Sequence, residues 1–152
     1  MTTITTRLAT LEDLDPVASL FDAYRQFYKQ APDLALAREF MRERLERSDS
    51  VVIVAESASK NVIGFCQLYP SFCSIRAAPT YTLYDLFVSP EARGMGAGRS
   101  LMIAAQKHAA QTGAARMELS TARNNTAAQS LYESLDWVRD ENFFVYNKSL
   151  RS

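Results

Sequence analysis

The chain has 152 residues and a formal net charge of zero, with 17 basic and 17 acidic residues. This length suits one domain with a substantial core, and the 47% of hydrophobic and 22% of charged residues exclude extensive disorder. Balanced charge argues against a nucleic-acid-binding protein, the sequence contains no membrane-spanning segment, and two cysteines suggest neither a disulfide framework nor a metal site. We therefore expect one cytoplasmic domain over residues 1–152, without a metal and without nucleic-acid or membrane partners.

The first half of the chain is predicted to hold a strand, two helices and a hairpin. Residues 3–9 have a strand pattern, and Thr10 caps a helix whose apolar residues recur at helical spacing as far as Tyr28. Asp33 follows a proline and caps a second helix. Two apolar segments, 51–56 and 62–69, flank turn residues and form an antiparallel hairpin.

The second half alternates strands and helices. Residues 70–79 are expected to be a connection, and 80–88 an apolar central strand. A helix follows as far as about Thr112, with Gly113 as its cap. A strand over 115–121, a helix from Asn125 and two short strands, over 137–139 and 143–148, complete the order. This pattern indicates an α/β (α+β) fold in which only the middle of the chain requires a parallel pair of strands.

Glycines at every second position follow the central strand. Ser89 and Pro90 end the strand, and Gly94, Gly96 and Gly98 lead into the next helix. Glycines let backbone N–H groups approach an anion closely, and a helix N-terminus adds free donors and a favourable dipole. The spacing differs from both the P-loop and the dinucleotide fingerprint. The loop is therefore a candidate phosphate cradle, the alternative being a tight strand–helix connection.

Two motifs together resemble the GNAT superfamily of acyl-CoA-dependent N-acyltransferases. The first is Arg-Gly-x-Gly-x-Gly from Arg93, after a strand that ends in Phe-Val. The second runs from Asn125 through Ala128 and Leu131-Tyr132 to Trp137. Its departure from the family pattern is Asp136, where the family usually has glycine, and aspartate also tolerates left-handed backbone geometry.

The resemblance covers essentially the whole chain and implies a fold and a donor. The GNAT fold has a mixed central sheet of about six to seven strands with four helices, splayed between the fourth and fifth strands. The donor is acetyl-CoA, whose pantetheine arm pairs with the backbone near Phe87 and Val88. Asn125 would contact that arm or support the splay, and Ala128 is a further candidate contact. We also expect a homodimer. The CoA pyrophosphate would lie on Arg93, Gly94, Met95, Gly96, Ala97, Gly98, Arg99 and Ser100.

Tyr132 is the candidate proton donor by its place in the second motif. A phenol can protonate the departing thiolate, a contribution of ~10²–10⁴-fold, and the alternative is a core tyrosine. Freeing the lone pair of an alkylammonium costs ~4–5 kcal/mol near neutral pH. Asp85 and Glu118, on the strands that would splay, are the candidate carboxylates for that step. Asp85 could instead be a buried structural partner, and Glu118 could face solvent.

Other candidate residues have simpler interpretations. His108 is expected at the surface of a helix and Cys66 in the core, and neither Cys66 nor Cys73 has a motif for nucleophilic catalysis. The residues that could line an acceptor pocket, or equally the core, are aromatic: Tyr24, Phe27, Tyr28, Phe72 and Tyr81.

These features predict an N-acetyltransferase that moves acetyl from acetyl-CoA directly to a primary amine. We expect a small-molecule amine, such as a polyamine or an amino acid derivative, as the acceptor. The alternatives are a lysine or N-terminal amine of a protein, a non-catalytic CoA-binding sensor, and a structural protein with an empty loop.

Overall fold

The computed structural model describes residues 3–151, which fall into two compact units, one up to residue 120 and one from residue 121. A single acetyltransferase domain over the whole chain stays a prediction. Among the described residues, no helix has the length and apolar character that crossing a bilayer requires.

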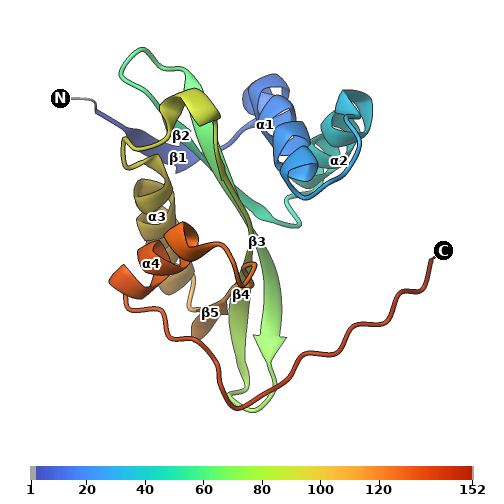
Figure 1. Ribbon diagram of the computed structural model, residues 1–152, viewed down its shortest axis with the longest axis vertical. Coiled ribbons are helices and arrows are strands. Elements are labelled where there is room, and N and C mark those ends of the chain that lie inside the picture. The colour runs from blue at the N-terminus through green and yellow to red at the C-terminus, as the bar shows by residue number, and fades with distance from the viewer. Residues whose placement is uncertain (1–2, 152) are drawn as a thin grey trace. The chain divides into compact units, whose positions relative to one another are not determined.

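The first unit is built on a five-stranded sheet with the order β1-β2-β3-β4-β5 (Figure 1). The first four strands are antiparallel to their neighbours, and β5 is parallel to β4. The strands are β1 (Thr5–Leu8), β2 (Val51–Glu56), β3 (Val62–Cys73), β4 (Ala78–Val88) and β5 (Arg116–Glu118).

Helices cover both faces of this sheet. A 3₁₀ turn, η1 (Leu11–Asp13), leads into α1 (Leu14–Phe27), which packs beside α2 (Leu34–Arg47), and η2 (Pro90–Ala92) precedes α3 (Ala97–Gln111). Phe65 of β3 joins the apolar cluster of α1 and α2, whereas the next residue, Cys66, points its Sγ at the Leu101 carbonyl of α3. Because successive side chains of a strand alternate between faces, α1 and α2 lie on one face and α3 on the other.

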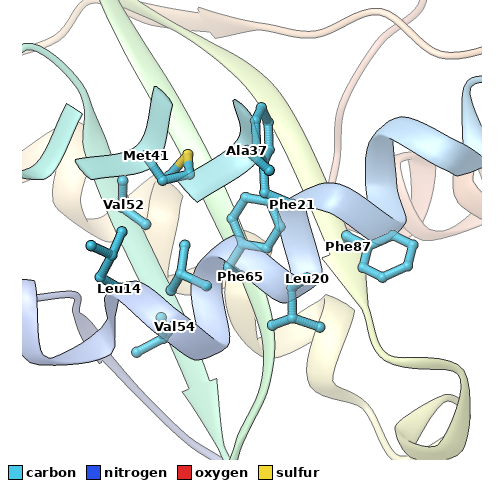
Figure 2. Packing of buried hydrophobic residues seen from close by; sticks show 10 residues of the cluster. Leu14, Leu20, Phe21, Ala37, Met41, Val52, Val54, Phe65 and Phe87 are labelled. Atoms are coloured by element: carbon cyan, nitrogen blue, oxygen red, sulfur yellow. The ribbon is translucent and has the colours of Figure 1, made fainter. Parts of the chain in front are cut away.

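The core of the first unit lies between α1, α2 and the middle of the sheet. Figure 2 shows Phe21 and Met41 from these helices among Val52, Phe65 and Phe87 from the strands. The Phe21 ring stacks on Phe40 at 5.3 Å between centroids and meets Phe65 edge-on at 6.3 Å. Burial of such large side chains contributes roughly 1.5–3 kcal/mol each, so this cluster fixes the helices against β3 and β4.

Polar residues start two helical segments, and a glycine follows the end of α3, where the sequence predicts these caps. The Thr10 N–H donates to Asp13 Oδ2 at 2.8 Å, and Asp33 Oδ1 accepts from the Leu36 N–H at 3.1 Å. After α3, Gly113 adopts a φ of +86°, the left-handed geometry of a helix C-terminus. The expected caps at Asp33 and Gly113 are confirmed.

The expected connection over residues 70–79 is wrong, because most of it belongs to the sheet. Pro70 pairs with Tyr81 and Phe72 with Pro79, so β3 and β4 form one long hairpin that turns at residues 74–77. Proline usually marks the edge or the end of a strand since it lacks an N–H donor. Here both prolines lie in the outer part of the hairpin, beyond the segment that the core covers.

The second unit contains α4 (Thr126–Ser134) and an extended segment. The prediction of six to seven strands is wrong, because residues 137–139 and 143–148 form no strand in the described chain. Their side chains are largely exposed, from 79% at Phe143 to 91% at Tyr146. A strand pattern becomes a strand only where a neighbouring edge accepts its backbone hydrogen bonds. In the described chain no strand edge pairs with these residues.

Candidate active site

The glycine loop between β4 and α3 offers a row of backbone donors. Gly94 and Gly96 have φ values of +82° and +86°, which turn the chain sharply into α3. In residues 3–151, the N–H groups of residues 94–98 have no hydrogen-bond acceptor, as expected where a helix begins. A Cβ at Gly94 or Gly96 would meet no atom within 4 Å. The loop is therefore open above these donors and fits a phosphate-bearing ligand such as acetyl-CoA.

Arg93 directly precedes the glycine loop and folds back onto the end of β4. Its Nε donates to the Val88 carbonyl at 3.0 Å, and its guanidinium lies 5.3 Å from the centre of the Phe87 ring. This places a permanent positive charge at the end of β4. It also means that the Val88 carbonyl, one of the groups predicted to pair with the pantetheine arm, already has a donor.

β4 leaves part of its edge without a strand neighbour. Within residues 3–151, β5 pairs with β4 only at Thr80, Tyr81 and Thr82, so residues 83–88 pair on one side alone, with β3. The pairing therefore stops where the sequence predicts the fourth and fifth strands to separate. A bulge falls at this point, because Leu83 faces Leu68 and Asp85 faces Gln67, which leaves Tyr84 as the extra residue.

Asp85 is buried directly after the bulge. Its residue is 2% exposed, and its Oδ2 accepts a hydrogen bond from Gln67 Nε2 at 2.6 Å. Burial raises the pKa of the Asp85 carboxyl above its ordinary value, while the hydrogen bond from Gln67 lowers it. A carboxyl with a raised pKa can accept a proton near neutral pH more readily than an exposed one.

Three tyrosines lie at the bulge, and one of them, Tyr84, is the extra residue itself. The Tyr24 hydroxyl of α1 donates to the Tyr84 carbonyl at 3.0 Å, and burial followed by the nearby Asp85 charge raises the Tyr24 pKa. The rings of Tyr69 and Tyr84 meet edge-on at 5.4 Å. Tyr24 thus has contacts with both the bulge and the carboxyl, and it links α1 to the edge of β4.

Glu118 lies in a different environment from Asp85. Its side chain is 59% exposed, with Arg116 3.6 Å away and the Thr82 hydroxyl 3.4 Å from Oε1. Of the two carboxylates singled out from the sequence, Asp85 is therefore the one placed in a desolvated site beside the unpaired edge.

The remaining candidates of the first unit lie around the start and outer face of α3. Arg99 is exposed, Met95 is 38% exposed, and Ala97 is buried. Ser100 lines a groove of about 540 Å³ between α3 and β1, together with Lys107 and His108. The His108 ring lies 6.0 Å from Tyr81. Cys66 is in the core, where burial raises its pKa to about 12 and makes it inert as a nucleophile.

The other aromatic candidates differ in exposure. Phe27 and Tyr28, at the end of α1, are 58% and 46% exposed, and Phe72 is 80% exposed on the outer hairpin. Only Tyr24 contacts the candidate site directly.

The second-motif residues belong to the second unit. Asn125 Oδ1 accepts from the Ala128 N–H at 3.3 Å and so caps α4. Tyr132 is half-buried, and its ring lies 6.4 Å from Trp137. Asp136 has a φ of +68°, which confirms that aspartate keeps the left-handed turn at this position. Tyr132 belongs to α4, in which no described residue is buried. Its role, and those of Asn125 and Ala128 toward CoA, stay predictions.

Sequence reasoning missed Gln67 and Ser50. Gln67 is fully buried and links the Ser50 hydroxyl, 2.7 Å from its Oε1, to the Asp85 carboxyl. The available signal was a lone amide in an otherwise apolar strand segment, cross-strand from a lone carboxylate. In the described chain, His, Cys, Asp and Glu side chains form no group of three or more that could hold a metal ion.

Comparison with known proteins agrees with this geometry. The model of the acetyltransferase (GNAT) family matches residues 17–137. An uncharacterized N-acetyltransferase, YhfO, from Bacillus subtilis is 44% identical over 140 residues, which cover 92% of this chain and 93% of the relative. An uncharacterized N-acetyltransferase from Archaeoglobus fulgidus is 30% identical, over 89% of this chain and 93% of its own length.

A solved structure shares the fold over the full length. The crystal structure of a probable acetyltransferase has a TM-score of 0.90 and 37% identity, and covers 99% of both chains. The family match spans both motifs and the strand that carries Asp85. The chain therefore belongs to the GNAT family of acetyltransferases.

Proposed function

We propose that the protein transfers the acetyl group of acetyl-CoA directly to the primary amine of a small molecule. The observation that carries this proposal is the row of free N–H groups over residues 94–98, directly after the unpaired edge of β4. Such a row suits the CoA pyrophosphate, and the unpaired edge offers backbone groups to the pantetheine arm in the manner of an added strand.

The chain's residues divide the chemistry between two proton transfers. We assign the first to Asp85, which takes one proton from the acceptor's ammonium group so that the nitrogen lone pair can attack the thioester carbon. Because Asp85 is 2% exposed, this transfer runs through an intervening water or hydroxyl group. As the C–N bond forms and the C–S bond breaks, the nitrogen releases its second proton to water and the sulfur gains a proton from Tyr132. The Tyr132 phenolate then regains a proton from water.

A small acceptor suits the composition better than a basic protein tail, because the net charge of the chain is zero. Polyamines and amino acid derivatives are the classes we propose. The homodimer and the cytoplasmic location stay predictions.

A CoA-release assay tests the proposal. Acetyl-CoA is offered with monoamines, diamines, amino acid derivatives and lysine peptides, and calorimetry measures acetyl-CoA binding in parallel. We expect saturable binding and CoA release that depends on a small amine. Binding without release on any amine would support the sensor, and absence of binding would leave only a structural role.

A further inference from the structure

We propose that Ser50 and Gln67 are positioning residues that hold the Asp85 carboxyl in one orientation through two consecutive hydrogen bonds. This inference rests on the proposed function, because there Asp85 accepts the proton of the acceptor amine. It concerns two residues, Ser50 and Gln67, that the sequence motifs do not include.

The geometry forms a short chain of polar contacts inside the unit. Ser50 precedes β2, and its Oγ donates to Gln67 Oε1 at 2.7 Å. The Gln67 amide is fully buried, and its Nε2 donates to Asp85 Oδ2 at 2.6 Å and lies 3.8 Å from Met41 Sδ. Gln67 and Asp85 are direct partners across β3 and β4. Each end of the amide is thus occupied by a group that the sheet holds in place.

The Ser50 hydroxyl can donate or accept, whereas an ionised Asp85 accepts only. The carboxyl therefore sets which end of the amide faces it, and Ser50 holds that orientation by donating to Oε1. With Ser50 donating to Oε1, the Nε2 group points at the carboxyl and stabilises its ionised form. If the amide turned over, Oε1 would face Asp85 Oδ2, and an ionised carboxyl would meet an acceptor. That arrangement is favourable only for a protonated Asp85. Ser50 therefore acts on Asp85 through the orientation of Gln67.

The other groups around Asp85 do not replace this function. From α1 comes the Tyr24 hydroxyl, and from β3 come the Cys66 thiol and the Tyr69 hydroxyl, each of which responds to the Asp85 charge. Tyr69 in turn responds to Arg44 and Asp49 at the end of α2. Since Oδ2 already receives an N–H, a proton on Asp85 belongs on Oδ1.

The test is a titration of the Asp85 carboxyl by carbon-13 NMR, with Asp85→Asn to identify its signal. Gln67→Met removes the donor, and Ser50→Ala removes the hydroxyl that holds the donor in place. Each therefore raises the Asp85 pKa, Gln67→Met by about one pH unit. Ser50→Thr keeps the hydroxyl and restores the wild-type value. Ser57→Ala is the matched control, because Ser57 lies in the turn at the other end of β2, where its hydroxyl contacts Ser59.

The outcomes separate this inference from the proposed function. An unchanged Asp85 pKa in both folded Ser50→Ala and Gln67→Met, or an equal rise in Ser50→Ala and Ser50→Thr, overturns the positioning role. In the acetyl-transfer assay, the acid limb of the pH–rate profile moves up with the Asp85 pKa in Ser50→Ala and returns in Ser50→Thr. If the wild type transfers acetyl to no amine, the proposed function fails, while the titration still decides how Asp85 is held.

Discussion

The Asp85 carboxyl has opposite effects on stability and on the proposed reaction. Its folded-state pKa is raised above the ordinary value of 3.8, chiefly by burial. The stability that the neutral carboxyl contributes is therefore fully present below about pH 3.8 and is lost as the pH rises through the folded-state pKa. Above the folded-state pKa, the ionised carboxyl lies in a desolvated place, which lowers the free energy of unfolding.

Asp85→Asn should consequently stabilise the protein while lowering its activity. Asparagine keeps an oxygen that accepts from Gln67 Nε2 and carries no charge at any pH. We expect a higher melting temperature than the wild type at pH 7, with the difference vanishing toward pH 4. We expect kcat/KM to fall by ~10²-fold near neutral pH and to recover partly as the pH rises.

Melting curves and pH–rate profiles on one monoamine and one diamine check this prediction. A KM that rises for the diamine alone would assign Asp85 to acceptor binding. Unchanged kinetics on both amines across the pH range would remove Asp85 from the site.

Tyr132→Phe tests the proton donor for the thiolate. The ring and its neighbour Trp137, 6.4 Å away, are retained, so we expect the fold and acetyl-CoA binding to persist. Turnover should drop by ~10²-fold, the lower range for a lost general acid. Tyr146→Phe is the control, because Tyr146 lies in the same unit and is 91% exposed. Equal turnover in the two variants would contradict the assignment.

At the scale of elements, the loop before α3 is defined by backbone geometry more than by side chains. Gly96 and Gly113 share a φ of +86°, and at neither would a Cβ meet any atom within 4 Å. Valine at either position therefore carries the same backbone strain, at least ~1–2 kcal/mol. The two glycines differ in location: Gly96 begins α3 at the free N–H groups, and Gly113 follows the end of that helix.

Comparing Gly96→Val with Gly113→Val separates an effect on ligand binding from an effect of backbone strain. Gly96→Val should weaken acetyl-CoA binding by at least tenfold in calorimetry, since the side chain would occupy the open space above the donors. Gly113→Val should lose similar stability yet bind acetyl-CoA as the wild type does. Equal affinities in the two folded variants would show that the loop does not bind the pyrophosphate.

The bulge at Tyr84 explains why the site was only partly predictable. A residue inserted in β4 shifts the inside–outside alternation by one, so Leu83 and Asp85 face opposite sides of the sheet although they are two residues apart. No turn residue marks this insertion. Helix starts at Asp33 and Asn125 were predictable because their caps are local, whereas the Ser50–Gln67–Asp85 contacts join three segments distant in sequence.

The same distinction holds for the end of the chain. The pattern over residues 143–148 has the aromatic and β-branched side chains of a strand, and this local preference was read correctly. A strand also requires a partner, which is a property of the whole fold rather than of six residues. Phe144 is 91% exposed and Val145 81% exposed, outside any sheet of the described chain.

At the scale of the whole molecule, Arg7 forms ion pairs that link the edge strand β1 to the rest of the first unit. From β1 it contacts Asp13 Oδ1 at 2.7 Å and Glu56 Oε1 at 3.0 Å. Its hydrogen bonds hold the pKa of the Asp13 carboxyl below its usual value. The stability that Asp13 contributes is present above about pH 3.8 and is lost as the pH falls through the lower folded-state pKa, the reverse of Asp85.

Arg7→Leu should leave both carboxylates without a cation and cost ~1–3 kcal/mol at pH 7. The deficit should shrink as the pH falls through the lowered pKa of Asp13. Arg38→Leu is the control, because the Arg38–Asp15 pair is exposed, at 52% and 79%, and such pairs contribute about 0–1 kcal/mol. Chemical denaturation of both variants between pH 3 and 8 measures the effect. A deficit in Arg7→Leu that is independent of pH would show that Arg7 acts through packing alone.

Acetyl-CoA binding at the end of β4, as proposed, would require Arg93 to change its hydrogen-bond partners. In the free protein its Nε satisfies the Val88 carbonyl at 3.0 Å, with the guanidinium over Phe87. If acetyl-CoA aligns with this end of β4 as proposed, it would share or take over that carbonyl, and a released guanidinium would be available to a phosphate. Arg93 would then contribute to the binding free energy of acetyl-CoA only the difference between two sets of contacts. One set is lost, with the Val88 carbonyl and the Phe87 ring, and the other is gained, with the phosphate.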